Sequence, residues 1–209
     1  FGSADISREK KERIGFLPEE SYLYPFLTIK ETVSFTAALY KNCKDTKSRI
    51  NEMLDLVGVG QFSNRKISEC SKGMARRTAM AQSLIHDPEL ILFDEPTSGY
   101  DPIGIAEVKE LIKKLKARGK TILLCSHQLN EVEDLCDDIL LLYKGDVIVS
   151  GEISELLGEQ GEAFAISKNN TAKVSELLDT NSIEYEKFLR GDLEKFFIEK
   201  VKRCSAESL

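Results

Sequence analysis

The 209-residue sequence predicts an α/β fold built on a parallel sheet, and three observations support this prediction. Two short apolar runs, Leu90–Phe93 and Thr121–Cys125, have the length and composition of strands buried on both faces. A helical pattern lies between them. Strand–helix–strand order is typical of a doubly wound sheet, in which functional groups lie in the loops after the carboxyl ends of the strands.

The amino-terminal elements follow the same order. Ile14–Leu17 is an apolar run closed by Pro18, which predicts a strand that ends in a loop. Apolar positions with helical spacing predict two helices within 28–56, and another helix over 71–85. Glycines at 58 and 60 separate these helices.

The helix between the two central strands has clear boundaries. Asp101 is a suitable N-cap, Pro102 suits the first helical position and Gly119 suits the residue after the last turn. Further along, a helix over 130–136 and a strand over 139–143 are predicted. The Lys144–Asp146 turn then leads into a strand over 147–149.

The alternation of apolar strands and helices changes in character near Gly158. We therefore predict a main domain over 1–157 and a small α+β extension over 158–209. The extension shows no catalytic grouping. Its predicted elements are a strand over 163–167, a helix over 171–178, a strand over 183–188 and a helix over 193–202.

Composition excludes several classes of protein. The formal net charge of −6 and pI of about 5.2 disfavour a broad basic face for nucleic acid. No apolar stretch approaches the roughly 20 residues that span a bilayer. The five cysteines are scattered without a Cys-x-x-Cys pair, which fits reduced thiols in the cytosol, and Cys125 is expected to be buried within its strand.

Two adjacent carboxylates, Asp94 and Glu95, follow the Leu90–Phe93 strand. An Asp there suits Mg²⁺ held partly through water, and a second acid beyond the metal can position an attacking water. If the two central strands are neighbours, His127 projects beside both acids. The alternatives are that the acids are solvated and that His127 is an ordinary loop histidine; His86, before a turn, is assigned a structural role.

A further candidate site is the start of the 71–85 helix. Helix amino termini expose free N–H groups, and Gly73 allows a close approach, so Ser71–Met74 could bind an anion. The alternative is that Ser71 is simply an N-cap.

Taken together, these segments resemble the nucleotide-binding domain of ABC-type ATPases. The resemblance covers about Gly2 to Gly151, in the family's order and spacing. Its motifs are a signature-like Cys70–Met74 followed by Arg77, a Walker B-like Leu90–Glu95, a D-loop-like Pro96–Asp101, a switch histidine at His127 and a Q-loop-like Ile14–Glu19.

The resemblance implies a P-loop NTPase-like sheet core with an inserted helical subdomain over about 27–86, and it implies ATP and Mg²⁺ as ligands. Glu95 would polarise the attacking water and His127 would contact the γ-phosphate. Asp94 and Glu19 would hold Mg²⁺.

The same resemblance implies a head-to-tail dimer. Ser71 and Gly73 would close on the γ-phosphate of the ATP in the opposite protomer, and Asp101 would communicate between the two sites. Lys72, Met74, Ser98 and Gly99 belong to the same nucleotide-binding segments.

Several residues depart from the family pattern. Glu19 stands where Gln is usual, and it either binds Mg²⁺ or is a loop acid with no metal role. Tyr100 replaces Leu, and the signature has Cys70, Lys72 and Met74 at changed positions. Lys72 adds a cation where phosphate would lie, or is simply solvated.

The phosphate loop GxxxxGK[ST] is not found in the sequence. Gly119-Lys120-Thr121 is a decoy, because it ends a predicted helix and enters a strand, the reverse of a phosphate loop. The resemblance therefore leads us to expect that the family's amino-terminal portion lies upstream of Phe1, and that the chain alone binds ATP poorly and is inactive.

The expected function is that of an ATP-hydrolysing subunit of an ABC transporter of the exporter-like branch. Its partner would be a separate permease, with Phe26, Leu27 and Phe35 as candidate contacts, although core packing is the favoured expectation for Phe35. The protein would lie in the cytoplasm at the inner face of the membrane. We expect no nucleic-acid binding and no direct insertion. Two alternatives stay open: a soluble ABC-type ATPase of translation or DNA repair, and a catalytically incomplete cassette used as a binding or regulatory module.

Overall fold

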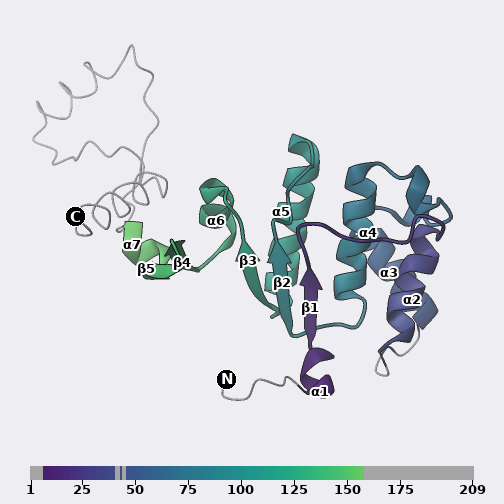
Figure 1. The fold of residues 1–209 in the computed structure, drawn as a ribbon, viewed down its shortest axis with the longest axis horizontal. Helices are drawn as coiled ribbons and strands as arrows, with labels where there is room; N and C mark the ends of the chain where they lie inside the picture. Colours follow the sequence, from purple (N-terminus) through teal and green to yellow (C-terminus); the bar gives the residue numbers. More distant parts are fainter. Residues whose placement is uncertain (1–6, 41–42, 44–45, 158–209) are drawn as a thin grey trace, which may run out of the picture. The chain divides into compact units, whose positions relative to one another are not determined.

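A computed structural model describes residues 7–40, 43 and 46–157 (Figure 1). The extension predicted over 158–209 lies outside them, and its boundary remains a prediction. The chain divides into two compact units, one up to Glu131 and one from Val132 onward, and each is described by itself.

The first unit is built on a parallel sheet of three strands in the order β1 (Ile14–Leu17), β2 (Leu90–Asp94) and β3 (Thr121–Cys125). Leu17 pairs with Phe93, and Asp94 pairs with Cys125, so the carboxyl ends of all three strands meet at one edge. The predicted parallel sheet and the neighbouring positions of its two central strands are confirmed.

One face of this sheet is covered by α4 (Lys72–Leu84) and α5 (Pro102–Ala117). Ile91 and Phe93 are at most 1% exposed, and Ile91 lines a small cavity with Leu84 of α4 and Leu115 of α5. The backbones of β1 and α4 approach so closely that a Cβ on Gly15 would lie 2.3 Å from the Ser83 carbonyl oxygen. Only glycine fits at this crossing.

Among the described residues of the first unit, nothing covers the opposite face of the sheet, which corrects the predicted burial on both faces. Phe16, Leu92 and Leu123 pair in one row across the three strands, and Phe16 and Leu123 are 57% and 58% exposed. Cys125 is also exposed, against expectation. The reason is that the described helices pack on the Ile91 face, and within the described residues no helix is packed on the other.

The inserted helical region comprises α2 (Ile29–Ala38), α3 (Thr46–Leu56) and α4, which pack together (Figure 1). A capping box starts α2, since the Thr28 hydroxyl accepts from Glu31 N–H and the Glu31 carboxylate accepts from Thr28 N–H. The apolar faces of these helices are largely buried. Tyr40 and Met74 are half-buried, and the fully buried residues of the same faces are Val33, Ala37, Ile50, Leu54, Val57, Thr78, Ala81, Leu84 and Ile85. Two short 3₁₀ helices, η1 (Gly60–Phe62) and η2 (Ile67–Glu69), complete this region before α4. Outside it, the short helix α1 (Arg8–Lys11) precedes β1.

The ends of α5 are as predicted. The Asp101 carboxylate accepts from Gly104 N–H at 2.7 Å, Pro102 is the first helical residue and Gly119 has a positive φ of 78°. In the second unit, β4 (Asp138–Tyr143) and β5 (Asp146–Glu152) form the predicted antiparallel hairpin and lead into α7 (Ile153–Leu157). The helix α6 (Leu129–Leu135) spans the division between the units.

No helix among the described residues is long and apolar enough to cross a membrane.

Candidate functional site

Glu95 and His127 form the centre of the site. Oε1 of Glu95 accepts a hydrogen bond from the His127 backbone N–H at 2.9 Å and lies 2.8 Å from the His127 Nδ1. The hydrogen bond and the negative charge of Glu95 raise the pKa of His127 above its usual 6.5. The predicted meeting of these two side chains is confirmed.

The carboxylate of Glu95 is held in an unusual backbone conformation. Its φ is +47°, a left-handed value that is uncommon for a side chain of this size, and its N–H donates to the Cys125 carbonyl at 2.9 Å. The side chain is only 14% exposed, and Oε2 is buried without a hydrogen-bond partner among the described residues. One oxygen is therefore fixed by His127, and the other is buried with an unmet capacity to accept a hydrogen bond.

Arg76 of α4 is the residue that the sequence did not predict. It is 6% exposed, and one of its terminal nitrogens donates to Pro18 O and to Glu19 O (2.6 Å) in the loop after β1. The other donates to Asp94 O and Glu95 O at 2.8 and 2.9 Å. Burial lowers the pKa of Arg76, while nearby Tyr100 and the acids oppose this effect. In the sequence, Arg76-Arg77 resembles an exposed basic pair, and no pattern distinguishes the two.

Asp94 and Glu19 are the candidate metal ligands. Arg76 brings their backbones together, and neither carboxylate has a hydrogen bond or ion pair with another described residue. No group of three or more His, Cys, Asp or Glu among the described residues could hold a metal ion. The donor set fits Mg²⁺, which is usually held by one or two carboxylates together with water and substrate phosphates.

The amino terminus of α4 is capped by Ser71, whose hydroxyl accepts from Met74 N–H at 3.2 Å. The structural alternative for Ser71 is thus observed, and phosphate binding by the same segment stays a prediction. Ser71 and Lys72 are exposed. Lys72 lies over the D-loop-like segment, because a Cβ on Gly99 would lie 2.9 Å from the Lys72 Cε, and the φ of Gly99 is +82°.

Tyr100 packs beneath this segment. A Cβ on Gly73 would lie 3.6 Å from its ring, and one on Gly104 would lie 2.7 Å from it. The Arg77 guanidinium lies 5.5 Å from the ring centroid. The Tyr100 hydroxyl is buried without a partner in the described structure, and burial raises its pKa to about 12.

The segments after β2 and β3 are also joined by a buried contact that the sequence did not predict. The Thr97 hydroxyl donates to Glu131 Oε2 at 2.7 Å, and both residues are at most 2% exposed. Ser126 adds a weaker donor at 3.4 Å. Ser98 lies in the turn between β2 and α5 and is partly exposed, while the carboxylate of Asp101 is used as the cap of α5.

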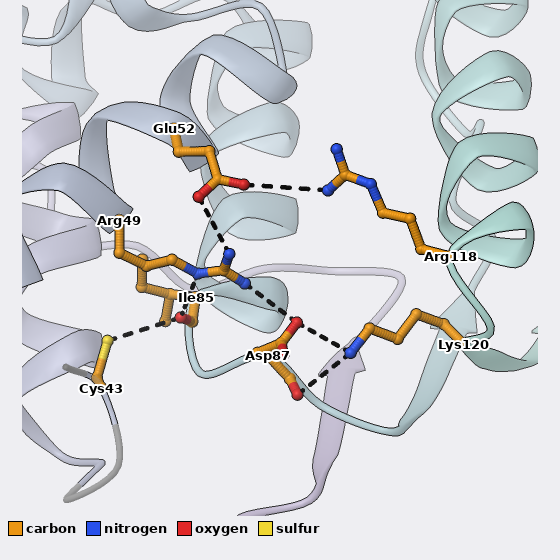
Figure 2. Close-up of polar contacts among 7 residues, drawn as sticks. All are labelled: Cys43, Arg49, Glu52, Ile85, Asp87, Arg118 and Lys120. Atoms are coloured by element: carbon orange, nitrogen blue, oxygen red, sulfur yellow. Dashed lines mark hydrogen bonds and ion pairs between the residues drawn. The ribbon is translucent and has the colours of Figure 1, made fainter. Parts of the chain in front are cut away.

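His86 and Lys120, which the sequence analysis did not assign to the site, lie away from it. His86 stacks on Tyr40 with ring centroids 3.9 Å apart and contacts Ile14 O through Nε2 at 3.0 Å, so its structural role is supported. Lys120 forms an ion pair with Asp87 at 2.9 Å at the amino ends of the strands (Figure 2). The Gly-Lys-Thr triplet thus lies at the edge of the sheet opposite Glu95.

Figure 2 shows the network around Lys120. Asp87 also accepts from Arg49 at 3.2 Å, and Arg49 contacts Glu52 at 3.2 Å and Ile85 O at 3.4 Å. These contacts join α3 to the loops that enter β2 and β3, which is a structural role.

An exposed aromatic surface follows the loop after β1. Tyr24, Phe26 and Phe35 are 53%, 68% and 51% exposed, and the Tyr24 ring lies 5.6 Å from Phe26 and 6.1 Å from Phe35. Backbone bonds from Ser68 N–H to Pro25 O (3.0 Å) and Ile67 N–H to Leu27 O (2.8 Å) fix the loop. We call Tyr24, Phe26 and Phe35 the aromatic surface.

Comparison with known proteins gives consistent matches. Residues 2–98 match the family model described as ABC transporter. An uncharacterized ABC transporter ATP-binding protein of Synechocystis is 45% identical over 154 residues, which cover 72% of this chain and 44% of that protein. The ABC transporter ATP-binding protein NatA of Bacillus subtilis is 41% identical, with 75% of this chain and 64% of NatA covered.

A solved structure, of a dimeric post-hydrolysis state of an ATP-binding cassette bound to ADP and phosphate, matches with a TM-score of 0.64 and 27% identity. The match covers 71% of this chain and 68% of that chain. The chain spans 44% and 64% of the lengths of the two curated relatives.

Proposed function

This chain belongs to the ABC transporter family of ATP-binding proteins, of the exporter-like type, and from that premise we propose that it is an ATP-hydrolysing subunit that powers transport through a separate permease. The observation that carries the proposal is the position of Glu95, which is fixed on one oxygen by His127 and whose second, buried oxygen has no partner within the described part of the chain. The Glu95 carboxylate is the group that orients and polarises the attacking water.

The neighbouring residues supply the remaining functions of such a site. His127 contacts the γ-phosphate, and its raised pKa favours the cationic form that pairs with phosphate. Asp94, assisted by Glu19, would hold Mg²⁺ by a carboxylate oxygen. When bound, the ion would neutralise phosphate charge.

The second protomer is part of the proposal. Ser71 and Lys72 are exposed at the start of α4, so they are accessible to a nucleotide held by another copy. Gly73 allows a close approach, and Met74, Ser98 and Gly99 complete this surface. The dimeric cassette in the matched structure supports a head-to-tail pair.

The permease would contact the aromatic surface. Leu27 is half-buried and Phe26 is exposed, and Phe35, for which core packing was the favoured expectation, is 51% exposed. Such a surface suits an amphipathic helix of a membrane protein. The subunit would thereby lie at the inner face of the membrane without insertion of its own helices.

The test uses the complete protein with its permease in liposomes, with Glu95→Gln as the variant. Because a general base contributes about 10²–10⁴-fold, ATP turnover should fall by at least ~100-fold while ATP still binds. Glu89→Gln is the matched control, since Glu89 precedes the same strand at its opposite end, in an ion pair with Arg13. Turnover that is unchanged in Glu95→Gln would refute the catalytic assignment. Full turnover without stimulation by any permease would favour a soluble ATPase instead.

A further inference from the structure

We propose that Arg76 is a positioning residue that couples the loop after β1, and through it the aromatic surface, to the backbone of Glu95. This inference rests on the proposed function, because the coupled group is the one assigned to water activation. Arg76 contacts Glu19, Asp94 and Glu95 only at their backbone carbonyls, so it acts on their side chains through the segments that it holds.

The geometry requires a guanidinium. One terminal nitrogen serves the loop, where it donates to Pro18 O, to Glu19 O at 2.6 Å and to the Ser21 hydroxyl at 3.2 Å. The other serves the end of β2 through Asp94 O and Glu95 O. Arginine presents five donors in a rigid plane, whereas lysine has one ammonium that cannot occupy both positions.

Burial of the Arg76 guanidinium costs desolvation free energy, which argues that its contacts serve a role. Arg76 is 6% exposed with no carboxylate bonded to it, and its Nε is buried without a partner among the described residues. A buried charge needs its donors satisfied, and here four backbone carbonyls provide that compensation. All four carbonyls belong to the two segments that carry Glu19 and Glu95.

Loss of the Arg76 contact would affect Glu95 through its backbone conformation. Its left-handed φ of +47° is held on one side by the bond to Cys125 O and on the other by Arg76. A strained conformation of this kind persists only while its surroundings determine it. Without the Arg76 contact, the backbone of Glu95 can relax and carry the carboxylate away from His127.

The loop side of the contact leads to the proposed partner. Ser21 is followed directly by Tyr22, which is 90% exposed, and then by Tyr24 and Phe26 of the aromatic surface. A partner that shifts this loop shifts the carbonyls of Pro18 and Glu19. Because the guanidinium is planar and rigid, the shift reaches the Glu95 carbonyl through a single side chain.

The test compares Arg76→Lys with Arg49→Lys in the complete protein with its permease. Both variants retain the charge and lose the guanidinium of a partly or fully buried arginine, but Arg49 joins α3 to Asp87, which lies at the opposite end of β2 from Glu95. We expect Arg76→Lys to lower kcat at least tenfold, to change KM for ATP less than twofold and to abolish stimulation by the permease. Arg49→Lys should retain all three values.

A second readout is independent of activity. Hydrogen exchange followed by mass spectrometry should show faster exchange in Arg76→Lys over both 19–24 and 94–100, and in neither segment for Arg49→Lys. Faster exchange in only one segment, or kcat equal to that of Arg49→Lys, overturns the inference. If Glu95→Gln leaves turnover intact while both segments open in Arg76→Lys, the mechanical coupling is supported and the proposed catalysis is the part that fails.

Discussion

Glu95 binds both the backbone N–H and the imidazole of His127 with the same carboxylate oxygen, at 2.9 and 2.8 Å. The two residues come from neighbouring strand ends, so the register between β2 and β3 determines this pairing. Any slip of that register would separate them, which makes the pair a sensitive reporter of the intact site.

The pairing predicts opposite titration of the two histidines. The pKa of His127 is raised by Glu95, and the pKa of His86 is lowered by burial, so their NMR midpoints should lie above and below about 6.5. Glu95→Gln should return the pKa of His127 toward 6.5 and leave His86 unchanged. Two midpoints on the same side of 6.5 in the wild type would contradict the structure.

The sign of the pH dependence of stability follows from the same shift. The pKa of His127 is higher in the folded state than in the unfolded state. The folding stability that protonated His127 contributes is therefore fully present below the unfolded-state pKa and is lost as pH rises through the folded-state pKa. The difference in unfolding free energy between the wild type and His127→Gln should therefore shrink from pH 6 to pH 9, as measured by urea denaturation.

Tyr100→Phe is predicted to be tolerated or stabilising. The variant removes a buried hydroxyl that has no partner among the described residues and keeps the ring that packs on Gly73 and Gly104. Relief of an unsatisfied polar group contributes up to about 1–3 kcal/mol, so the urea midpoint should stay equal or rise. Ultraviolet titration should lose the component that ionises near pH 12. A fall in the urea midpoint would show that the hydroxyl has a partner in solution.

Lys120→Met tests the decoy triplet. Lys120 is paired with Asp87 at the amino end of the sheet, so nucleotide affinity of the complete protein should be unchanged. The Asp87 side chain is 66% exposed and that of Lys120 is 17% exposed, so this partly exposed ion pair contributes about 0–1 kcal/mol, and 1 M salt should weaken it. The pKa of Asp87 is lowered by Lys120, so this small contribution is present at neutral pH and is lost as pH falls through the folded-state pKa. A large fall in nucleotide affinity would contradict our interpretation.

Phe26→Asp tests the aromatic surface. Phe26 is 68% exposed, so a charge there should cost little folding stability while it weakens association with the permease by at least tenfold. Leu39→Asp is the matched control, because Leu39 is a similarly exposed apolar residue, 56%, at the opposite end of α2. Co-purification with the permease provides the measurement. Equal loss in both variants would point to general destabilisation.

Much of the fold could be predicted because its signals are local. The strand runs, the Asp101–Pro102 start of α5 and the hairpin after Tyr143 depend on short patterns, and all were found in the structure. The meeting of Glu95 with His127 was also predictable, since neighbouring parallel strands place their ends together.

The contacts that were missed depend on tertiary packing. Nothing in Arg76-Arg77 shows which arginine points inward, because that depends on how α4 crosses the sheet. Thr97 and Glu131 are separated by 34 residues and meet only in the folded unit. Burial of β3 was predicted wrongly, because an apolar run indicates that a strand can be covered, not which of its faces is.

The open row of Phe16, Leu92 and Leu123 should affect how the purified chain behaves in solution. Apolar rings and branched chains lined up across three strands provide a flat patch that favours association with other hydrophobic surfaces. A preparation of these 209 residues should bind a hydrophobic dye, elute late or in aggregates from a sizing column, and become better behaved when Phe16 and Leu123 are replaced by threonine. Crystallisation of the domain should therefore be tried first with Phe16 and Leu123 replaced by threonine.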